Sequence, residues 1–494
     1  METKIETKIE TKIGKGAWIF LFLCLLLGIL GEEAFFRSEI GISYFVFIAA
    51  FYAVFMWRYR HFRFSHQRLG YLILCCIWLL SASYVLNNNI LFYALNIMVI
   101  PGLVIFHLAL ITIPENIKWN KPAFITLILT RLLQSLKFNI GFVNLIGKSL
   151  KQGVHEDKLL IWKKVGLGIA ISLPILFVVL NLLISADSQF EQLIGGIPQW
   201  FQVINAERII RLMIILFLTG TFFGFMQILS GRHFNVIKRQ TNEEAFKIDG
   251  IISITVLVLI NAVYLLFTLV QFRYFFSGTL QADFTYAEYA RKGFFELLFV
   301  TLINLSITVI VLTFVNRAAR FMQRATQIML TILVLASSIM LSSAFLRLSM
   351  YEDAYGFTFT RVLVHSFMIF LVVIFTYTLV KIWVEKLSLF HFYFISSLIY
   401  YTTITVIDLD KIVVNENMTR YELSGKIDVH YLNSLSYTGV LGLIDLYEKD
   451  KNIPELKTIL LERKQEAAAQ SLPWQTYNLK RERMFSELRK LDIN

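Results

Sequence analysis

The stretch Ile251–Phe272, IISITVLVLINAVYLLFTLVQF, contains no charged side chain. An α-helix rises about 1.5 Å per residue, so this stretch reaches across the roughly 30 Å hydrocarbon core of a bilayer. Inside lipid each backbone N–H and C=O must be bonded within the protein, and a helix achieves this by itself. The stretch therefore predicts a helix that crosses a membrane.

Similar apolar runs occur on both sides of this stretch. The predicted spans are Ala17–Gly31, Ile40–Trp57, Leu69–Leu86, Ile90–Ile113, Val165–Ala186, Ile209–Ser230, Ile251–Phe272, Gly293–Val315, Gln327–Phe345, Val362–Val380 and Leu387–Ile407. The composition agrees, since 56% of the 494 residues are hydrophobic and 17% are charged, whereas soluble domains carry about 25% charged residues. The sequence therefore predicts an all-α, polytopic transmembrane helical bundle with about eleven spans.

The positive charges predict the orientation of this bundle. More than half of the 47 Lys and Arg residues lie in segments on the same side as the N-terminus. Because basic loops stay in the cytoplasm, we expect a cytoplasmic N-terminus and an extracytoplasmic C-terminus. The net charge of +12 then reflects topology and attraction to anionic lipid headgroups on the inner face. It does not indicate nucleic-acid binding, which needs basic residues interleaved with stacking aromatics on a soluble module.

Composition divides the chain into five predicted regions. They are a cytoplasmic N-terminal tail (1–16), spans one to four (17–113), a basic cytoplasmic loop (114–164), spans five to eleven (165–407) and an extracytoplasmic helical tail (408–494). Within the basic loop, Ala123–Lys137 combines helical spacing of apolar residues with basic flanks, which predicts a helix lying in the inner membrane interface. A partner-binding helix and a re-entrant segment are the alternatives.

The polar tail carries three stretches with helical periodicity. Val440 and Tyr447 mark the first, Pro454 opens the second, and Gln475–Leu491 forms the third. We expect a small helical domain docked on the outer face of the membrane.

Motifs for common enzyme chemistry are missing from the sequence. It has no glycine-rich phosphate loop, no His-Glu-x-x-His and no nucleophile elbow. The cysteines Cys24, Cys75 and Cys76 all fall in apolar runs, so they suggest neither a disulfide framework nor a metal site. The sequence therefore predicts no catalytic residues, no metal site and no cofactor.

Several polar residues fall inside the predicted spans. The candidates are Asn181, Asn261, Asn304 and His365. Such side chains either bond helices together or line a polar pathway. No predicted span carries an unpaired charge at its centre, which speaks against a proton- or ion-coupled pump.

Charged and aromatic residues gather at the predicted outer boundary. The candidate binding residues are Asp187, Tyr286, Glu288, Tyr289, Arg291, Glu296, Arg347, Tyr351 and Arg361. Glu288 and Arg291 are one helical turn apart and can pair, while Glu296 lies about one turn inside the membrane and needs a partner. These residues could be an ion-pair network that fixes the outer helix ends. They could equally form an outward-facing pocket for an anionic headgroup or a peptide.

Motifs around these residues resemble a known family. They are Ser185-Ala-Asp187, Thr285-Tyr-Ala-Glu-Tyr-Ala-Arg-Lys-Gly-Phe-Phe-Glu-Leu297, Tyr355-Gly-Phe-Thr-Phe-Thr-Arg361, Gly425-Lys-Ile-Asp428, Tyr431-Leu-Asn-Ser-Leu435 and Trp474-Gln-Thr-Tyr-Asn-Leu-Lys-Arg481. The family is a bacterial multi-pass one, the domain of unknown function four-one-seven-three, with a sister numbered four-one-five-three. Tyr437-Thr438-Gly439 replaces the acidic-alanine-proline turn expected there. The resemblance implies a bacterial cytoplasmic-membrane protein and supplies no activity.

Three functions follow from these observations. The first is a non-enzymatic membrane protein whose outward-facing charged and aromatic site binds a ligand, a lipid headgroup or a protein partner in the cell envelope. The second is a transporter or lipid translocase, which predicts a membrane-deep polar path. The third is a membrane-embedded enzyme acting on envelope substrates, which predicts that Asp187, Glu288 or Glu296 converge in a cleft.

Overall fold

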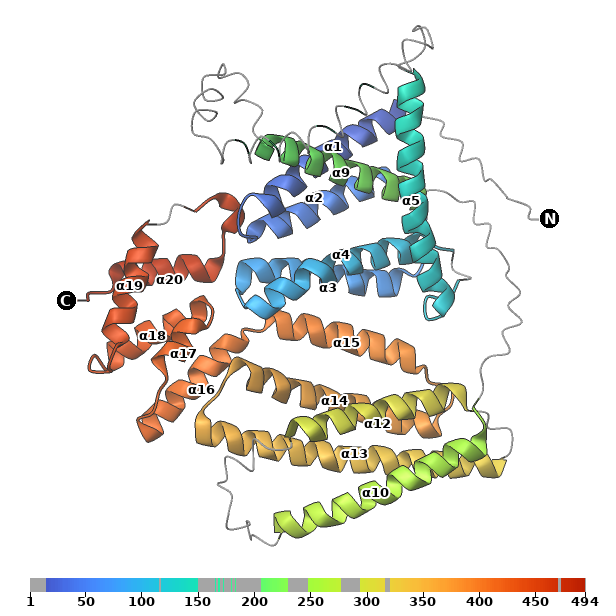
Figure 1. Cartoon of the computed structure of the whole chain (residues 1–494), viewed down its shortest axis with the longest axis vertical. Coiled ribbons are helices and arrows are strands. Elements are labelled where there is room, and N and C mark those ends of the chain that lie inside the picture. The colour runs from blue at the N-terminus through green and yellow to red at the C-terminus, as the bar shows by residue number, and fades with distance from the viewer. Residues whose placement is uncertain are drawn as a thin grey trace. The chain divides into compact units, whose positions relative to one another are not determined.

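The computed structural model describes residues 15–114, 117–149, 206–229, 248–276, 294–315, 320–469 and 472–493, together with the isolated positions 165, 168, 172, 179 and 183. Within these residues the chain forms sixteen α-helices and one short 3-10 helix (Figure 1). The predicted all-α class is confirmed.

Nine of the described helices are long and apolar enough to cross a membrane. They are α1 (Lys15–Phe36), α3 (Gln67–Leu86), α4 (Ile90–Thr112), α9 (Ala206–Leu229), α10 (Gly250–Phe276), α12 (Phe294–Phe314), α13 (Arg320–Tyr355), α14 (Phe359–Trp383) and α15 (Leu389–Val406). Helix α2 (Ile42–Arg58) is also apolar but shorter. The chain is therefore a multi-pass membrane protein. The predicted span Val165–Ala186 lies largely outside the described residues.

Helix α10 shows why these helices need lipid around them. Its apolar side chains Ile251, Leu259 and Leu266 are 68%, 64% and 65% exposed, whereas the polar Asn261 is buried. The amide of Asn261 donates to the Met329 carbonyl of α13 at 2.9 Å. A helix of a soluble protein has the reverse pattern, with its polar residues exposed and its apolar residues buried. The pattern of α10 is stable only where the helix is surrounded by an apolar solvent such as lipid.

The described helices fall into two units, which we describe separately. Unit 1 comprises Met1–Gln67 and Ile105–His233. Its helices α1 and α9 approach closely at Gly28, where a Cβ would lie 2.7 Å from the Ile215 carbonyl oxygen. One turn further, the buried carboxylate of Glu32 lies 3.4 Å from Arg37 and 3.5 Å from Arg211. Two half-exposed guanidinium groups thus balance one buried charge.

Helix α5 (Pro122–Ser149) belongs to the same unit and runs across α9 rather than along it (Figure 1). The amide of Asn139 donates to the Gly220 carbonyl at 2.8 Å. Helix α5 also exposes the apolar side chains Ile125, Leu129 and Leu133. This helix is longer than the predicted stretch, and a crosswise helix with an apolar outer face is what an interfacial position requires. The interfacial position itself stays a prediction.

Unit 2 comprises Arg68–Val104 and Phe234–Asn494. Its helices α10, α12, α13 and α14 share an apolar cluster that includes Leu257, Leu330, Leu333, Met340, Leu371 and Phe375. Within this cluster the buried amide of Asn304 on α12 donates to the Ser337 hydroxyl of α13 at 2.9 Å. Asn261 and Asn304 therefore both bond one helix to the next.

Helix α13 is longer than the predicted span Gln327–Phe345. Its 36 residues extend about 54 Å, well beyond the roughly 30 Å of a hydrocarbon core. Arg347, one of the candidate residues of the predicted outer boundary, lies buried on the last turns of this helix, and so does Glu352, which the sequence analysis did not name. Polar residues ended the apolar run that was used for the prediction, but they did not end the helix.

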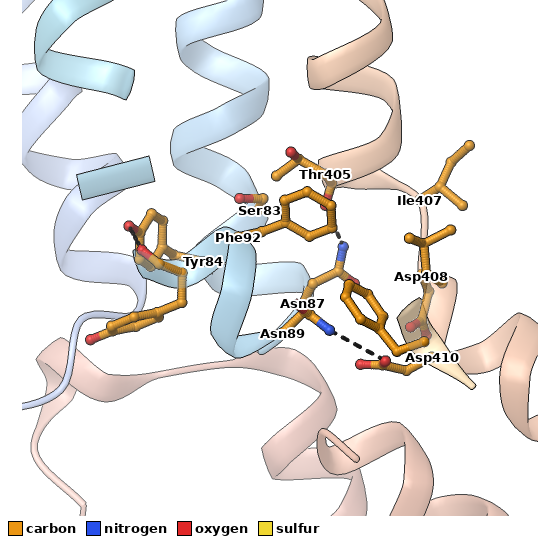
Figure 2. A pocket seen from close by; sticks show the side chains of 12 residues that line it. Ser83, Tyr84, Asn87, Asn89, Phe92, Thr405, Ile407, Asp408 and Asp410 are labelled. Atoms are coloured by element: carbon orange, nitrogen blue, oxygen red, sulfur yellow. Dashed lines mark hydrogen bonds between the residues drawn. The ribbon is translucent and has the colours of Figure 1, made fainter. Parts of the chain in front are cut away.

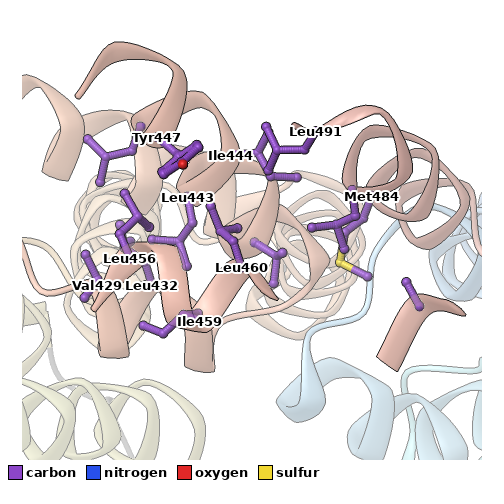
Figure 3. Packing of buried hydrophobic residues seen from close by; sticks show 14 of the residues in the cluster. Val429, Leu432, Leu443, Ile444, Tyr447, Leu456, Ile459, Leu460, Met484 and Leu491 are labelled. Carbon is purple, nitrogen blue, oxygen red and sulfur yellow. The ribbon is translucent and has the colours of Figure 1, made fainter. Parts of the chain in front are cut away.

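The tail forms a small domain with its own apolar core (Figure 3). Its elements are α16 (Leu409–Ser424), α17 (Val429–Ser434), α18 (Tyr437–Lys449), α19 (Leu456–Ala469), η1 (Trp474–Thr476) and α20 (Leu479–Lys490). Leu432, Leu443 and Leu460 are completely buried in this core. Helices α16 and α17 have no counterpart among the three predicted stretches.

Residues Tyr437-Thr438-Gly439 form the first turn of α18 and not a loop. A Cβ on Gly439 would lie 2.1 Å from the Leu432 carbonyl oxygen of α17. Glycine at this position therefore allows α17 and α18 to touch along their backbones. The departure from the expected acidic-alanine-proline turn has a packing reason.

Candidate functional site

Six of the sequence-predicted residues lie outside the part of the chain that the structure describes. They are Asn181, Asp187, Tyr286, Glu288, Tyr289 and Arg291. Their convergence into one site stays a prediction.

The structure brings Tyr351 and Arg361 together. The Arg361 guanidinium lies over the Tyr351 ring, 4.1 Å from its centre, and donates to the Gly356 carbonyl. Arg347 is buried on α13, whereas Glu296 is exposed in the first turn of α12. Within the described ranges Glu296 forms no ion pair with either arginine.

His365 lies between α13 and α14. Its Nδ1 is 2.9 Å from the Glu352 carboxylate, and its Nε2 is 3.4 Å from the Ser349 hydroxyl. Glu352 is buried, and its Oε1 atom meets no hydrogen-bond partner among the residues described. Sequence reasoning identified His365 but missed this carboxylate, because the apolar run of the span ended before it.

A separate hollow with a cavity volume of about 20 Å³, room for a group of about the size of one water molecule, lies in unit 2, where the ends of α3, α4, α14 and α15 meet the first turn of α16 (Figure 2). Its lining residues are Ser83, Tyr84, Asn87, Asn89, Phe92, Tyr93, Phe359, Thr405, Ile407, Asp408, Leu409 and Asp410. Four of these side chains are aromatic and two are carboxylates. We call this feature the tail-side hollow.

The aromatic side chains of the tail-side hollow are paired edge to face. Phe92 and Phe359 have ring centres 6.0 Å apart, and Tyr84 and Tyr93 have ring centres 5.1 Å apart. The Tyr84 hydroxyl also donates to the Tyr93 carbonyl at 2.7 Å. Such pairs fix the orientation of each ring, so the aromatic wall is preformed.

Asp408 connects the end of α15 to the tail. Its carboxylate caps α16 by accepting the Lys411 backbone N–H at 3.2 Å, as the N-cap position requires. It also accepts the Thr438 hydroxyl at 3.1 Å and pairs with the Lys480 ammonium. Each of its bonds therefore holds one tail element near the membrane helices.

Asp410 is the buried acid of the tail-side hollow, with 3% of its surface exposed. It accepts hydrogen bonds from Asn89 at 3.4 Å and from the Ser436 hydroxyl, and the first of these is drawn in Figure 2. Burial raises the pKa of Asp410 above its ordinary value, an effect that the Ser436 hydrogen bond opposes and the neighbouring Asp408 charge reinforces. The Lys480 ammonium also lowers the pKa of Asp410, but its ion pair is with Asp408.

Asparagines clamp the tail to the helix ends. The Asn87 amide donates to the Thr405 carbonyl at 3.0 Å, which joins the end of α3 to the end of α15. The Asn478 amide donates to the Tyr84 carbonyl at 2.9 Å, and the Lys480 ammonium donates to Asn87 at 2.7 Å. The start of α20 is thereby fixed beside the tail-side hollow.

A second set of contacts fixes the tail to the turn between α13 and α14. Asn417 of α16 accepts from the Phe357 N–H at 3.1 Å and donates to its carbonyl at 2.8 Å. The Tyr431 hydroxyl accepts the Phe359 N–H at 2.7 Å. The tail is thus held at two places, and the tail-side hollow lies next to both.

Sequence reasoning missed the residues of the tail-side hollow, although two signals were present. Three consecutive asparagines, Asn87, Asn88 and Asn89, separate two apolar runs, and Asp408 and Asp410 follow directly on the last one. Asn89 and Asp410 are 321 residues apart in sequence, so neither signal indicates the other.

We expect Asn478→Asp to weaken the attachment of the tail to the end of α3 while keeping the N-cap of α20. The new carboxylate can still accept the Lys480 and Arg481 N–H groups, but it places an acceptor against the Tyr84 and Asn87 carbonyls. An unsatisfied buried polar group costs about 1–3 kcal/mol and a charged one more. Hydrogen exchange in the α20 peptides should therefore rise.

The matched control is Asn433→Asp, because the Asn433 side chain accepts from Arg463 at 2.9 Å and an aspartate preserves that bond. Equal hydrogen exchange of the α20 peptides in the two variants would show that the Asn478 amide bonds do not hold the tail.

Comparison with known proteins identifies the family. The model described as Domain of unknown function (DUF4153) matches residues 74–446, well over half of the 494 residues. This range includes every residue that lines the tail-side hollow. No curated protein and no solved structure matches the chain. The match falls on the sister family named in the sequence analysis, and the chain belongs to the DUF4153 family of domains of unknown function.

Proposed function

We propose that this chain is a non-enzymatic binding protein of the membrane that holds the ammonium group of a lipid headgroup in the tail-side hollow. The observation that carries the proposal is the buried carboxylate of Asp410, which lines the hollow and has no cationic side chain bonded to it among the described residues. Placing a cation nearby would compensate the cost of a buried negative charge.

The charge of the hollow determines the class of ligand. Asp408 already has the Lys480 ammonium as its partner, so the remaining negative charge belongs to Asp410. A cation fits such a region, and an anion would be repelled. The expected ligand thus has the opposite sign to the anionic one considered for the sequence-predicted residues.

The aromatic rings favour an organic cation. Ammonium groups bind over aromatic faces, where the ring quadrupole attracts them once water is removed. Phe92 and Phe359 supply such rings beside Asp410. Preformed apolar walls with a few directed polar groups are typical of sites for small ligands.

The position of the hollow supports a lipid as the source of this ammonium group. It is lined by residues from the ends of α3 and α15, two helices of spanning length. Lipid headgroups lie at the depth where spanning helices leave the hydrocarbon core. A headgroup can therefore enter without leaving the bilayer.

Native mass spectrometry of the full chain can test the proposal. The protein is extracted from vesicles that contain equal amounts of phosphatidylethanolamine and phosphatidylglycerol, and the retained lipids are counted. We expect preferential retention of phosphatidylethanolamine. Equal retention of both lipids would contradict the proposal.

Soluble glycerophosphoethanolamine distinguishes the two sources of the ammonium group. If the site takes lipid, this headgroup should displace phosphatidylethanolamine only at concentrations far above the lipid's own. Displacement at equal concentration would assign the site to a free ligand. Absence of displacement at any concentration would show that the ammonium group is not what is recognised.

The location of the protein is part of the same proposal. From the family resemblance we infer that the protein lies in a bacterial cytoplasmic membrane. From the distribution of Lys and Arg we infer that the N-terminus is cytoplasmic, that the basic inner loops face anionic lipid headgroups, and that the tail lies in the cell envelope. A cysteine at Asn433 should react with a membrane-impermeant thiol reagent on intact cells. Reaction only after lysis would invert the orientation.

A second candidate function is proton-coupled transport, which one observation favours. Glu352 is a buried carboxylate at the contact of two spanning helices, paired with His365 at 2.9 Å. Ionisable residues within membrane helices commonly form proton relays.

Under this second candidate, Glu352→Gln should abolish proton movement into proteoliposomes that hold a potassium diffusion potential and a pH-sensitive dye. The control is Asp353→Asn, because Asp353 is exposed on the same turn. If proton entry into vesicles with the wild-type protein is no faster than into vesicles without protein, proton-coupled transport is excluded.

A further inference from the structure

Residues 474–481 of the tail have a reversed pattern of burial. The apolar side chains Trp474, Tyr477 and Leu479 are 46%, 39% and 47% exposed. Four polar side chains of the same segment are only 4–5% exposed, and they are Gln475, Thr476, Asn478 and Arg481. In a water-soluble domain, Arg and Gln lie outside and Trp and Leu lie inside. A reversed pattern therefore indicates that the surroundings of this segment are not water.

The reversal is built into the structure by specific hydrogen bonds. The Asn478 side chain caps α20 by accepting the Lys480 and Arg481 N–H groups at 3.0 and 3.2 Å. The Arg481 guanidinium donates to the Thr476 carbonyl. These bonds hold the polar groups inside, so the apolar side chains are directed outward.

The segment lies beside the point where a spanning helix ends. The Asn478 amide donates to the Tyr84 carbonyl at 2.9 Å and to the Asn87 carbonyl at 3.2 Å. Leu86, the last residue of α3, is 37% exposed. The exposed apolar residues of the tail therefore lie in a segment that is bonded to the end of α3, where an apolar side chain is exposed as well.

We propose that Trp474, Tyr477 and Leu479 form a membrane-contact surface that lies in the interfacial layer of the bilayer. Trp and Tyr concentrate at this depth because they combine an apolar ring with one polar atom. The tail is then a domain partly immersed in lipid and not one that merely stands on the membrane. This inference does not depend on which ligand occupies the tail-side hollow.

Spin labelling of the full chain in proteoliposomes tests the proposal. Cys24, Cys75 and Cys76 are replaced by alanine, and one nitroxide is attached at Leu479→Cys. Collision with oxygen, which concentrates in lipid, is compared with collision with a nickel complex, which stays in water. We expect the oxygen-to-nickel accessibility ratio at this position to be several-fold above that of a label at Leu423→Cys.

Leu423 is the matched control because it is also a leucine of the tail and is 86% exposed, but it lies between the exposed polar residues Glu422 and Ser424. A label at Leu479 that meets the nickel complex as often as the label at Leu423 would overturn the proposal. A label at Leu479 shielded from both reagents would overturn it as well, because protein rather than lipid would then cover the segment.

Discussion

Replacing Asp410 by Asn is expected to reduce the preference of the protein for phosphatidylethanolamine over phosphatidylglycerol by about tenfold to a hundredfold. Hydrogen bonds to charged groups contribute about 1.5–3 kcal/mol, and each 1.4 kcal/mol is a factor of ten in affinity. Asparagine keeps the shape of the side chain, and the Ser436 hydroxyl can rotate to accept from it. Native mass spectrometry of retained lipid measures the change.

Asp445→Asn is the control for this substitution. It makes the same chemical change on an exposed residue of α18 in the same domain, so it should leave the preference intact. An unchanged preference in the Asp410 variant, with its melting temperature also unchanged, would exclude Asp410 from the site.

The same carboxyl group predicts how binding and stability depend on pH. Because the folded-state pKa of Asp410 is raised above 3.8, the folded protein binds this proton more tightly than the unfolded chain does. Without ligand, the stability that this proton adds to the folded state is fully present below pH 3.8. It is lost as the pH rises through the raised pKa. Ammonium binding should follow the opposite course, because it needs the ionised form.

Gly439→Ala is expected to destabilise the tail by about 1–3 kcal/mol, the usual cost of forcing extra atoms into a packed site. The added Cβ would lie 2.1 Å from the Leu432 carbonyl oxygen and 2.8 Å from the Leu435 Cβ. A backbone oxygen cannot rotate away, so α17 and α18 must separate. Hydrogen exchange in the peptides of both helices should rise.

Gly425→Asn is the matched control for this glycine. Gly425 ends α16 in the left-handed region with φ +67°, and a Cβ there meets open space. Asparagine tolerates this conformation better than other residues, so the control variant should lose little stability. Equal exchange in the two variants would mean that α17 and α18 are not in close contact.

The membrane helices could be predicted from the sequence because their cause is local. A run such as Ile251–Phe272 has one stable state in lipid, and the structure has a helix there, α10. The prediction failed at the end of α13, where Arg347 and Glu352 are polar but remain helical. Hydropathy finds where a helix can be surrounded by lipid, and it does not report where its backbone hydrogen bonds stop.

The tail was predictable only in part. Apolar residues at helical spacing, such as Leu443 and Tyr447, predicted α18, but α16 carries no such stripe and was missed. The two capping residues, Asp408 at the N-terminus and Gly425 at the C-terminus, determine where helix α16 begins and ends. Capping signals are short and common, so they indicate a helix only after the neighbouring elements are known.

The candidate site could not be predicted, because no single segment contains it. Asp187 and Glu288 were predicted as site residues because they are close in sequence to predicted helix ends. Both lie outside the described residues. The tail-side hollow instead depends on Asn89 meeting Asp410 across 321 residues. Only the packing of α3 and α4 against α15 and α16 creates that contact.

Photo-crosslinking tests the central claim, that the tail-side hollow holds the ammonium headgroup, most directly. Vesicles with the full chain contain phosphatidylethanolamine that carries a diazirine beside its ammonium group, and mass spectrometry locates the crosslinks after irradiation. We predict crosslinks in the peptides around Phe92, Phe359 and Asp410, and their loss with excess unlabelled phosphatidylethanolamine. Crosslinks that cannot be displaced, or that fall on the membrane helices without marking these peptides, would contradict the claim.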